Sequence, residues 1–173
     1  MMRGCIQMIR VLSDLDAVQY WNLRLQALQM NPESFVTTYE EAMQKENPVE
    51  EVVRNLNSKT SYTFGAFNKE NQLMGVVTLL TEQKAAYKHK GHLVAMYVDH
   101  QSRGKGLAKC LIRALIEKAR ELKIEQISLG VVSDNEAAKK LYQSMSFTTY
   151  GIEKKALKMN GIYRDDEHMV LFL

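Results

Sequence analysis

Residues 92–122, HLVAMYVDHQSRGKGLAKCLIRALIEKAREL, decide how the rest of the chain is interpreted. They open with an apolar, β-branched run over residues 93–98, which is typical of a buried strand. A polar turn containing Gly104 and Gly106 follows. The apolar residues after the turn recur every three or four positions, which predicts an amphipathic helix ending near Leu122. The stretch therefore predicts a strand, a glycine loop and a helix in succession.

This order of elements favours an anion-binding site at the start of the helix. The first backbone N–H groups of a helix have no partner inside it, and the helix dipole makes that end partly positive. Glycines there let a phosphate reach the backbone without meeting a Cβ atom. Arg103, Lys105 and Lys109 add positive charge around the same turn. The alternative is a tight turn that needs glycine for its backbone conformation and binds nothing.

Two common phosphate-binding motifs are excluded by the sequence of the loop. A Walker A loop needs Gly-x-x-x-x-Gly-Lys-Ser/Thr, and the chain contains no such run. A dinucleotide fingerprint needs a third glycine where Lys109 stands, and no βαβ unit opens the chain. The loop is therefore neither a Walker A loop nor a Rossmann fingerprint.

Residues 101–106, Gln-Ser-Arg-Gly-Lys-Gly, match the pattern Gln/Arg-x-x-Gly-x-Gly/Ala. In this the chain resembles the GNAT superfamily of acyl-CoA-dependent N-acetyltransferases. A second GNAT signature, Asn-x-x-Ala-x-x-Leu-Tyr-x-x-x-Gly-Phe, is matched at Asn135, Ala138, Leu141, Tyr142 and Phe147. One position differs, because Ser146 stands where the family has glycine. If this position requires a positive φ, serine costs on the order of 1 kcal/mol of folding free energy.

The resemblance implies an α+β (mixed α/β) fold in which helices flank a central, twisted, mostly antiparallel mixed sheet. A length of 173 residues suits one domain over residues 1–173. Strands are predicted over residues 6–12, 62–67, 73–81, 93–98, 124–132, 147–151 and 166–173. Helices are predicted over residues 15–31, 38–46, 48–57 and 107–122, and from residue 137 to a break before Phe147. Ser133 and Glu136 have the spacing of a capping box for the last helix.

The resemblance also implies a cosubstrate, acetyl-CoA, and a set of residues to bind it. In GNAT enzymes the loop amides hold the pyrophosphate of coenzyme A. Main-chain groups of the preceding strand bind the pantetheine arm and polarise the thioester carbonyl. The cofactor-binding residues implied are Met96, Tyr97, Val98, Gln101, Arg103, Gly104, Lys105, Gly106, Leu107, Ala108 and Asn135. Asn135 has a second interpretation as a helix cap, and no metal site is implied.

The chemistry of acetyl transfer sets two further requirements. An amine attacks a thioester only when neutral, so an acceptor with a pKa near ~10 must lose a proton. The departing thiolate needs a proton, and the resemblance implies Tyr142 as the catalytic residue that supplies it. The general base stays open among Glu82, His92, Tyr97, Asp99 and ordered water.

The predicted function is transfer of acetyl from acetyl-CoA to a primary amine of a small molecule or a peptide or protein. The amine is expected to attack directly in a ternary complex. The alternative is a non-catalytic acyl-CoA-binding module of the same fold. Turnover distinguishes the two.

Composition and charge narrow the partners and the compartment. A net charge of +3 gives no support for a nucleic-acid partner. Cys5 and Cys110 form neither a disulfide framework nor a metal motif, which predicts two free thiols in a reducing compartment. We find no signal peptide or membrane span in the sequence, so a cytoplasmic protein without a membrane partner is expected. A homodimer is compatible with the resemblance.

Overall fold

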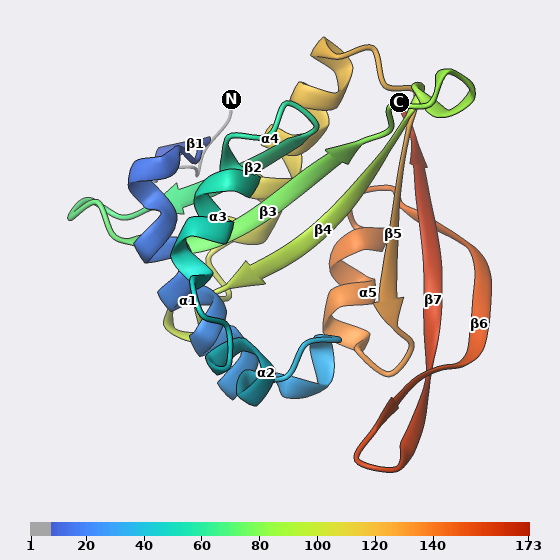
Figure 1. Cartoon of the computed structure of the whole chain (residues 1–173). Coiled ribbons are helices and arrows are strands. Elements are labelled where there is room, and N and C mark those ends of the chain that lie inside the picture. Colours follow the sequence, from blue (N-terminus) through green and yellow to red (C-terminus); the bar gives the residue numbers. More distant parts are fainter. Residues whose placement is uncertain (1–7) are drawn as a thin grey trace.

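The computed structural model describes residues 8–173 and is built on one seven-stranded sheet, with the strand order β1-β2-β3-β4-β5-β7-β6 (Figure 1). Within the described chain, β4 and β5 are the only neighbours that pair in parallel. The expected mixed, mostly antiparallel sheet flanked by helices is therefore confirmed. No helix of residues 8–173 is both long enough and apolar enough to cross a membrane.

The strands and helices follow the chain in an order close to the predicted one. The strands are β1 (Met8–Val11), β2 (Ser61–Phe67), β3 (Leu73–Thr81), β4 (Lys90–Val98), β5 (Gln126–Val132), β6 (Thr148–Met159) and β7 (Ile162–Phe172). The helices are α1 (Ala17–Met30), α2 (Tyr39–Met43), α3 (Pro48–Leu56), α4 (Leu107–Glu121) and α5 (Glu136–Gln143). Of the strand predicted over residues 6–12, Ile6 and Gln7 lie outside the described residues.

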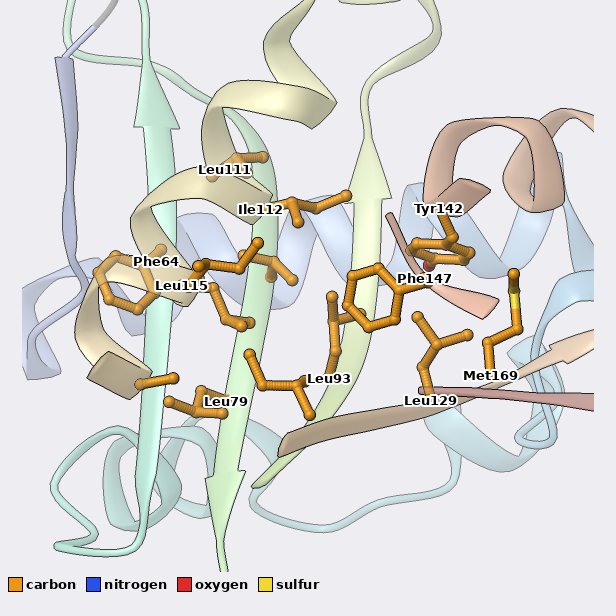
Figure 2. Packing of buried hydrophobic residues seen from close by; sticks show 14 of the residues in the cluster. Phe64, Leu79, Leu93, Leu111, Ile112, Leu115, Leu129, Tyr142, Phe147 and Met169 are labelled. Carbon is orange, nitrogen blue, oxygen red and sulfur yellow. The ribbon is translucent and has the colours of Figure 1, made fainter. Parts of the chain in front are cut away.

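Two layers of helices bury the two faces of the sheet. On one face, Leu111 and Leu115 of α4 are fully buried in a core that also holds Tyr142 of α5 and Phe147 (Figure 2). On the other face α1 packs on β3 and α3 packs on β2. The spacing of apolar residues along α4 predicted the first layer correctly, because a helix buries the side on which its period gathers them.

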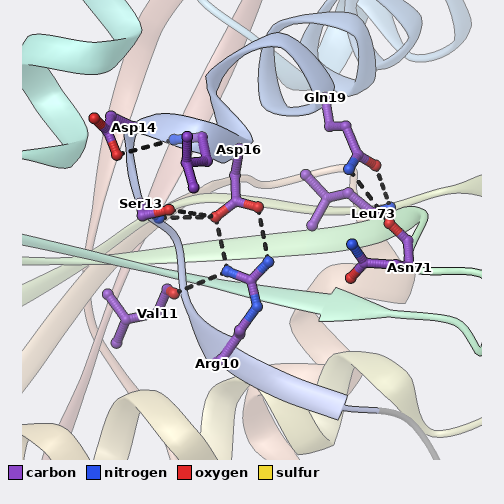
Figure 3. A network of polar contacts seen from close by, with 9 residues as sticks. Arg10, Val11, Ser13, Asp14, Asp16, Gln19, Asn71 and Leu73 are labelled. Atoms are coloured by element: carbon purple, nitrogen blue, oxygen red, sulfur yellow. Dashed lines mark hydrogen bonds and ion pairs between the residues drawn. The ribbon is translucent and has the colours of Figure 1, made fainter.

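The start of α1 is fixed to the sheet by a polar network (Figure 3). Arg10 of β1 donates two hydrogen bonds to Asp16, at 2.7 and 2.8 Å, and the Ser13 amide donates to the same carboxylate at 2.8 Å. Hydrogen bonding to Arg10 lowers the pKa of Asp16 despite its burial. Further along α1, the Gln19 side chain accepts a hydrogen bond from the Leu73 amide at 2.9 Å. These contacts hold α1 against the edge of the sheet.

The last two strands are longer than predicted. The expected strands over 147–151 and 166–173 are parts of one long hairpin, β6 and β7, which turns at Asn160 and Gly161. Both turn residues have positive φ, 49° and 79°, as a two-residue hairpin turn requires. A bulge between Glu153 and Leu157 interrupts the alternation of side chains in β6. That interruption hid the strand from a search for period-two patterns.

The cap of α5 is also different from the predicted one. Helix α5 begins at Glu136, and the side chain of Asn135 caps it by accepting a hydrogen bond from the Ala138 amide at 3.1 Å. Ser133 is not the cap, because its Oγ is buried without a hydrogen-bond partner among the described residues, and its amide donates to the Asp165 carbonyl instead of to Glu136. The predicted Ser133–Glu136 capping box is therefore wrong, and Asn135 takes the capping role that was its second interpretation.

The prediction of two free thiols is also wrong. Cys110, in the first turns of α4, is disulfide-bonded, and no cysteine within residues 8–173 is free. Cys5 lies outside the described residues. Spacing along the sequence could not reveal this bond, because separation along a chain does not limit closeness in space. The argument for a reducing compartment that rested on free thiols therefore fails.

Ser146, in the turn that follows α5, has the left-handed conformation, with φ of 69°, as its place in the GNAT signature suggested. Replacing it with glycine should remove the Cβ clash and raise the free energy of unfolding by about 1 kcal/mol. The Tm should rise by roughly 2–4 °C. Ser144→Gly is the matched control, because Ser144 has an ordinary helical φ of −66° and glycine there should lower the Tm. A Ser146→Gly protein that is no more stable than the parent contradicts this account.

Candidate active site

A gap opens in the middle of the sheet where β4 and β5 separate. Their pairing covers three positions, from Lys90 opposite Gln126 to His92 opposite Ser128. Beyond this point β4 continues along β3 as far as Val98, whereas β5 continues along β7. The downstream half of β4 therefore presents an unpaired edge to the gap, with backbone groups available to a ligand.

A bulge in β4 changes which side chains face each layer of helices. Tyr97 pairs with Val76 and Val94 pairs with Thr78, so two residues of β4, Ala95 and Met96, lie opposite one residue of β3. Ala95 has a positive φ of 53°. Before the bulge the odd-numbered Leu93 packs in the core beneath α4, but after it the odd-numbered Tyr97 packs with α1 residues. The bulge thus turns Tyr97 to the opposite face of the sheet.

A cavity of about 550 Å³ occupies the gap. Its walls come from the end of β4, the start of α5 and the 3₁₀ turn Pro32–Ser34 that follows α1. Phe35 lies on the α1 side of the sheet and Ala108 on the α4 side, and both line the cavity. The cavity therefore connects the two faces of the sheet.

The glycine loop lies directly beside this cavity. Gly104 and Gly106 have φ of 74° and 78°, and a Cβ added to either would meet no atom within 4 Å. Gly106 is the N-cap of α4 and offers no side-chain cap, whereas Thr38 and Asn135 cap α2 and α5. The first amides of α4 are therefore left for another partner. A second hollow of about 390 Å³ lies against this turn.

The two hollows bring together most of the predicted cofactor-binding residues. The larger is lined by Met96, Tyr97, Val98, Arg103, Ala108 and Asn135, and the smaller by Val98, Arg103, Gly104, Gly106, Leu107 and Ala108. Gln101 and Lys105 are exposed and line neither hollow. That these residues bind a cofactor stays a prediction. Within residues 8–173 no three acidic, histidine or cysteine side chains are grouped to hold a metal ion.

Tyr142, the predicted acid, lies in the core that borders the cavity. Its side chain is 6% exposed, and its ring meets Phe147 edge to face with centroids 5.9 Å apart (Figure 2). Its helical neighbours Ala138 and Leu141 line the larger cavity, but Tyr142 itself does not. Burial raises the pKa of Tyr142 to about 12, so the phenol is protonated at neutral pH, as an acid must be. Its catalytic role stays a prediction.

The raised pKa of Tyr142 has a consequence for stability in alkali. An unfolded chain ionises tyrosine near pH ~10, whereas the folded protein keeps this phenol neutral up to about pH 12. Between these values the unfolded state releases the proton first, so the folded state loses stability as pH rises. We expect Tyr142 to account for a loss of about 2–3 kcal/mol by pH 12, which Tyr142→Phe should not show. Urea unfolding of both proteins from pH 9 to pH 12 measures the difference, and identical pH dependence would contradict it.

The four candidate bases occupy different places. His92 lies between two partners, with Nδ1 2.7 Å from the Ser128 hydroxyl and Nε2 2.9 Å from Glu82. Asp99 accepts a hydrogen bond from Gln26 at 2.6 Å, which suits a structural role. The Tyr97 hydroxyl is buried without a hydrogen-bond partner, and burial raises its pKa further from neutrality. None of these contacts singles out one of the four residues as the general base.

Sequence reasoning missed part of the cavity wall. Arg164 of β7 lines the cavity and forms an ion pair with Asp134 at the start of α5. From the other side Asn31 accepts a hydrogen bond from Arg103 at 2.9 Å, and Phe35 packs its ring 6.3 Å from that of Tyr97. The one available signal was the run of consecutive charged residues 164–167, of which a strand places every second one on the same face.

Comparison with known proteins agrees with this geometry. A family model described as the acetyltransferase (GNAT) family matches residues 24–147. The chain belongs to this family. This GNAT protein is an N-acetyltransferase, which is the activity that the names of its relatives give. It is 27% identical over 138 residues to the Bacillus subtilis protein "Probable N-acetyltransferase YjcK". The alignment covers 79% of this chain and 67% of the relative.

Solved GNAT structures share the fold. An acetyltransferase of the GNAT family from Streptococcus pneumoniae aligns with a TM-score of 0.83 at 22% identity, over 96% of this chain and 99% of that one. A GNAT phosphinothricin acetyltransferase from Sinorhizobium meliloti, solved in complex with acetyl-CoA, aligns with a TM-score of 0.81 at 18% identity, over 96% and 88%. At these identities the likeness concerns the fold of the GNAT domain alone.

Proposed function

We propose that this single domain transfers the acetyl group of acetyl-CoA to a primary amine by direct attack in a ternary complex. The observation that carries the proposal is the cavity between β4 and β5, which is open to both layers of helices. Acetyl-CoA enters from the side of the glycine loop, and the amine enters from the side of α1. The two substrates then meet within the sheet, and no acyl-enzyme intermediate is needed.

The residues around the cavity suit the parts of acetyl-CoA. The uncapped amides at the start of α4, with Gly104 and Gly106, would hold the pyrophosphate. Arg103 adds a positive charge at the boundary between the two hollows. The free edge of β4 at Met96 and Val98 would bind the pantetheine arm through backbone hydrogen bonds. A backbone amide at the bulge would polarise the thioester carbonyl, as a donor that is already oriented.

The reaction balances with groups that the site contains or that water supplies. The acceptor ammonium loses one proton, and the neutral nitrogen forms a bond to the thioester carbon. Collapse of the tetrahedral intermediate breaks the carbon–sulfur bond and releases the thiolate of coenzyme A, and the nitrogen loses its second proton to water to give the amide. Tyr142, whose phenol is neutral at pH 7, would donate a proton to that thiolate and recover it from solvent.

Calorimetric titration with acetyl-CoA, followed by thiol-release assays, tests the proposal. The acceptors to screen are L-amino acids, spermidine and a short peptide with a free N-terminus. Binding with turnover on any of these supports the acetyltransferase. Binding without turnover would favour the non-catalytic acyl-CoA-binding module. Absence of binding would show that the glycine loop is only a turn.

A further inference from the structure

Alternate residues of β7 place three charged or titratable side chains on one face of the sheet. Val132 pairs with Asp166 and Gly130 pairs with His168, so these side chains share a face with Arg164. Glu167 points to the other face, where it meets Lys139 of α5 at 3.5 Å. The Arg164, Asp166 and His168 side chains therefore lie on the face opposite α4 and α5. Figure 1 shows α1, α2 and α3 gathered over the other half of this face, away from β7.

Asp166 leans across β5 because residue 130 is glycine. A Cβ built on Gly130 would stand 2.5 Å from Oδ2 of Asp166, which is closer than such atoms approach in real structures. The carboxylate thus lies directly on the backbone of β5, next to the gap between β5 and β4. An alanine at position 130 would force it away.

Asp166 differs from its two neighbours in its bonding, because its one polar contact among the described residues is a long ion pair with His168 and no hydrogen bond. Asp165 forms an ion pair with Lys154 at 2.8 Å, and Glu167 accepts a hydrogen bond from Thr149. Asp166 accepts no hydrogen bond from residues 8–173, and its nearest charged neighbour is His168 Nδ1 at 3.9 Å. Burial raises the pKa of Asp166, since its side chain is only 24% exposed. A partly buried carboxylate that accepts no hydrogen bond is stabilised when a cation binds it.

The position of Asp166 near the cavity indicates the chemical class of cation that it would bind. Arg164, two residues away on the same face, lines the cavity. Asp166 pairs with Val132, the last residue of β5 before the turn into α5. Asp166 does not itself line the cavity, but it lies two residues from Arg164, which does, on the face opposite α4. In the proposed ternary complex this is the face from which the amine arrives.

We propose that Asp166 binds the ammonium group of the acceptor and takes its proton before the attack. This inference rests on the proposed acetyl transfer and names its acceptor class, a primary amine that enters as a cation. The ammonium N–H bond breaks, and the proton moves to the carboxylate oxygen. The neutral nitrogen keeps the electron pair that attacks the thioester. Asp166 afterwards returns the proton to water through its exposed side.

The charged groups around Asp166 fit this role. His168 on β7 and Glu153 on β6 face it and each other, with His168 Nε2 3.6 Å from Glu153. Arg164 is held by Asp134, which keeps its charge near the cavity wall. The residues of β5 on this face, Ser128, Gly130 and Val132, are not ionisable.

Asp166→Asn tests the inference, with Asp165→Asn as the matched control. The acceptor is spermidine or whichever primary alkylamine turns over in the thiol-release screen. At pH 7 we expect Asp166→Asn to lower kcat/KM about 100-fold, while its Kd for acetyl-CoA stays within about twofold of the parent. The deficit should shrink to below about tenfold near pH 10, where the free amine is neutral without help. Asp165→Asn, on the other face, should stay within about twofold of the parent in both quantities.

Gly130→Ala provides a second variant that keeps the carboxylate but displaces it. It should reproduce the low kcat/KM of Asp166→Asn at pH 7 and still bind acetyl-CoA. A parental rate in Asp166→Asn, or a deficit that is the same at pH 7 and pH 10, would overturn the inference. Either outcome would leave the proposed acetyl transfer intact. That proposal fails separately if the parent protein neither binds nor turns over acetyl-CoA.

Discussion

Gly104→Val is expected to lower the affinity for acetyl-CoA at least 100-fold without unfolding the protein. The residue has φ of 74°, a conformation that a β-branched side chain resists at a cost of about 1–3 kcal/mol. A Cβ there meets no protein atom within 4 Å, so it extends into the space that the pyrophosphate is proposed to fill. Calorimetric titration with acetyl-CoA measures the loss, and thermal unfolding shows whether the fold survives.

Gly161→Val separates backbone strain from loss of the anion site. Gly161 has φ of 79° and equally open surroundings, but it lies at the tip of the β6–β7 hairpin. The two variants should therefore lose similar stability, and only Gly104→Val should lose acetyl-CoA binding. Unchanged binding by a folded Gly104→Val protein would refute the proposed pyrophosphate site.

Tyr142→Phe is expected to slow thiol release about 10- to 100-fold, because no phenol remains to protonate the thiolate. This loss of rate is at or below the smallest effects typical of general acid catalysis. A thiolate whose conjugate acid has a pKa near ~8.5 is a fair leaving group even without a proton donor. The phenylalanine ring keeps the edge-to-face contact with Phe147, so stability near pH 7 should change by less than about 1 kcal/mol. Stopped-flow detection of free thiol at saturating acetyl-CoA and acceptor measures the rate.

Tyr163→Phe controls for the loss of a phenol elsewhere. Tyr163 is exposed at the start of β7 and lines no part of the cavity. Its rate should stay within about twofold of the parent. A parental rate in Tyr142→Phe would show that Tyr142 serves packing alone, and the proton would then come from solvent.

Local patterns predicted the centre of this fold well. The strand, glycine loop and helix over residues 92–122 were recognisable because each depends on neighbours a few positions away. The β6–β7 hairpin was underestimated, because the bulge after Glu153 broke the period, although Asn160-Gly161 is a strong turn signal. The cap of α5 was misassigned, since the competing cap, Ser133, is bonded to a strand that lies far along the chain.

In the candidate site, too, the parts formed by contiguous residues were predictable and the parts formed by distant strands were not. Two sequence motifs located the glycine loop and the start of α5, where acetyl-CoA is proposed to bind, because contiguous residues form both. The acceptor side depends on register between distant strands, as when Gly130 makes room for Asp166. No local pattern records that contact. The disulfide at Cys110 was missed as well, because no local cysteine motif marks it.

The bulge at Ala95 inserts one extra residue into β4 and so changes whether even- or odd-numbered residues face α1 and α3. Upstream of it, even-numbered positions such as Val94 face α3, and downstream of it the odd-numbered Tyr97 faces α1. Removing this one residue would leave Met96 alone opposite Val77 and Tyr97 still opposite Val76, so β4 would alternate regularly and keep its register with β3. The extra residue therefore acts on the local bend of the strand, beside the point where β4 separates from β5, rather than on the choice of side chains that face α1.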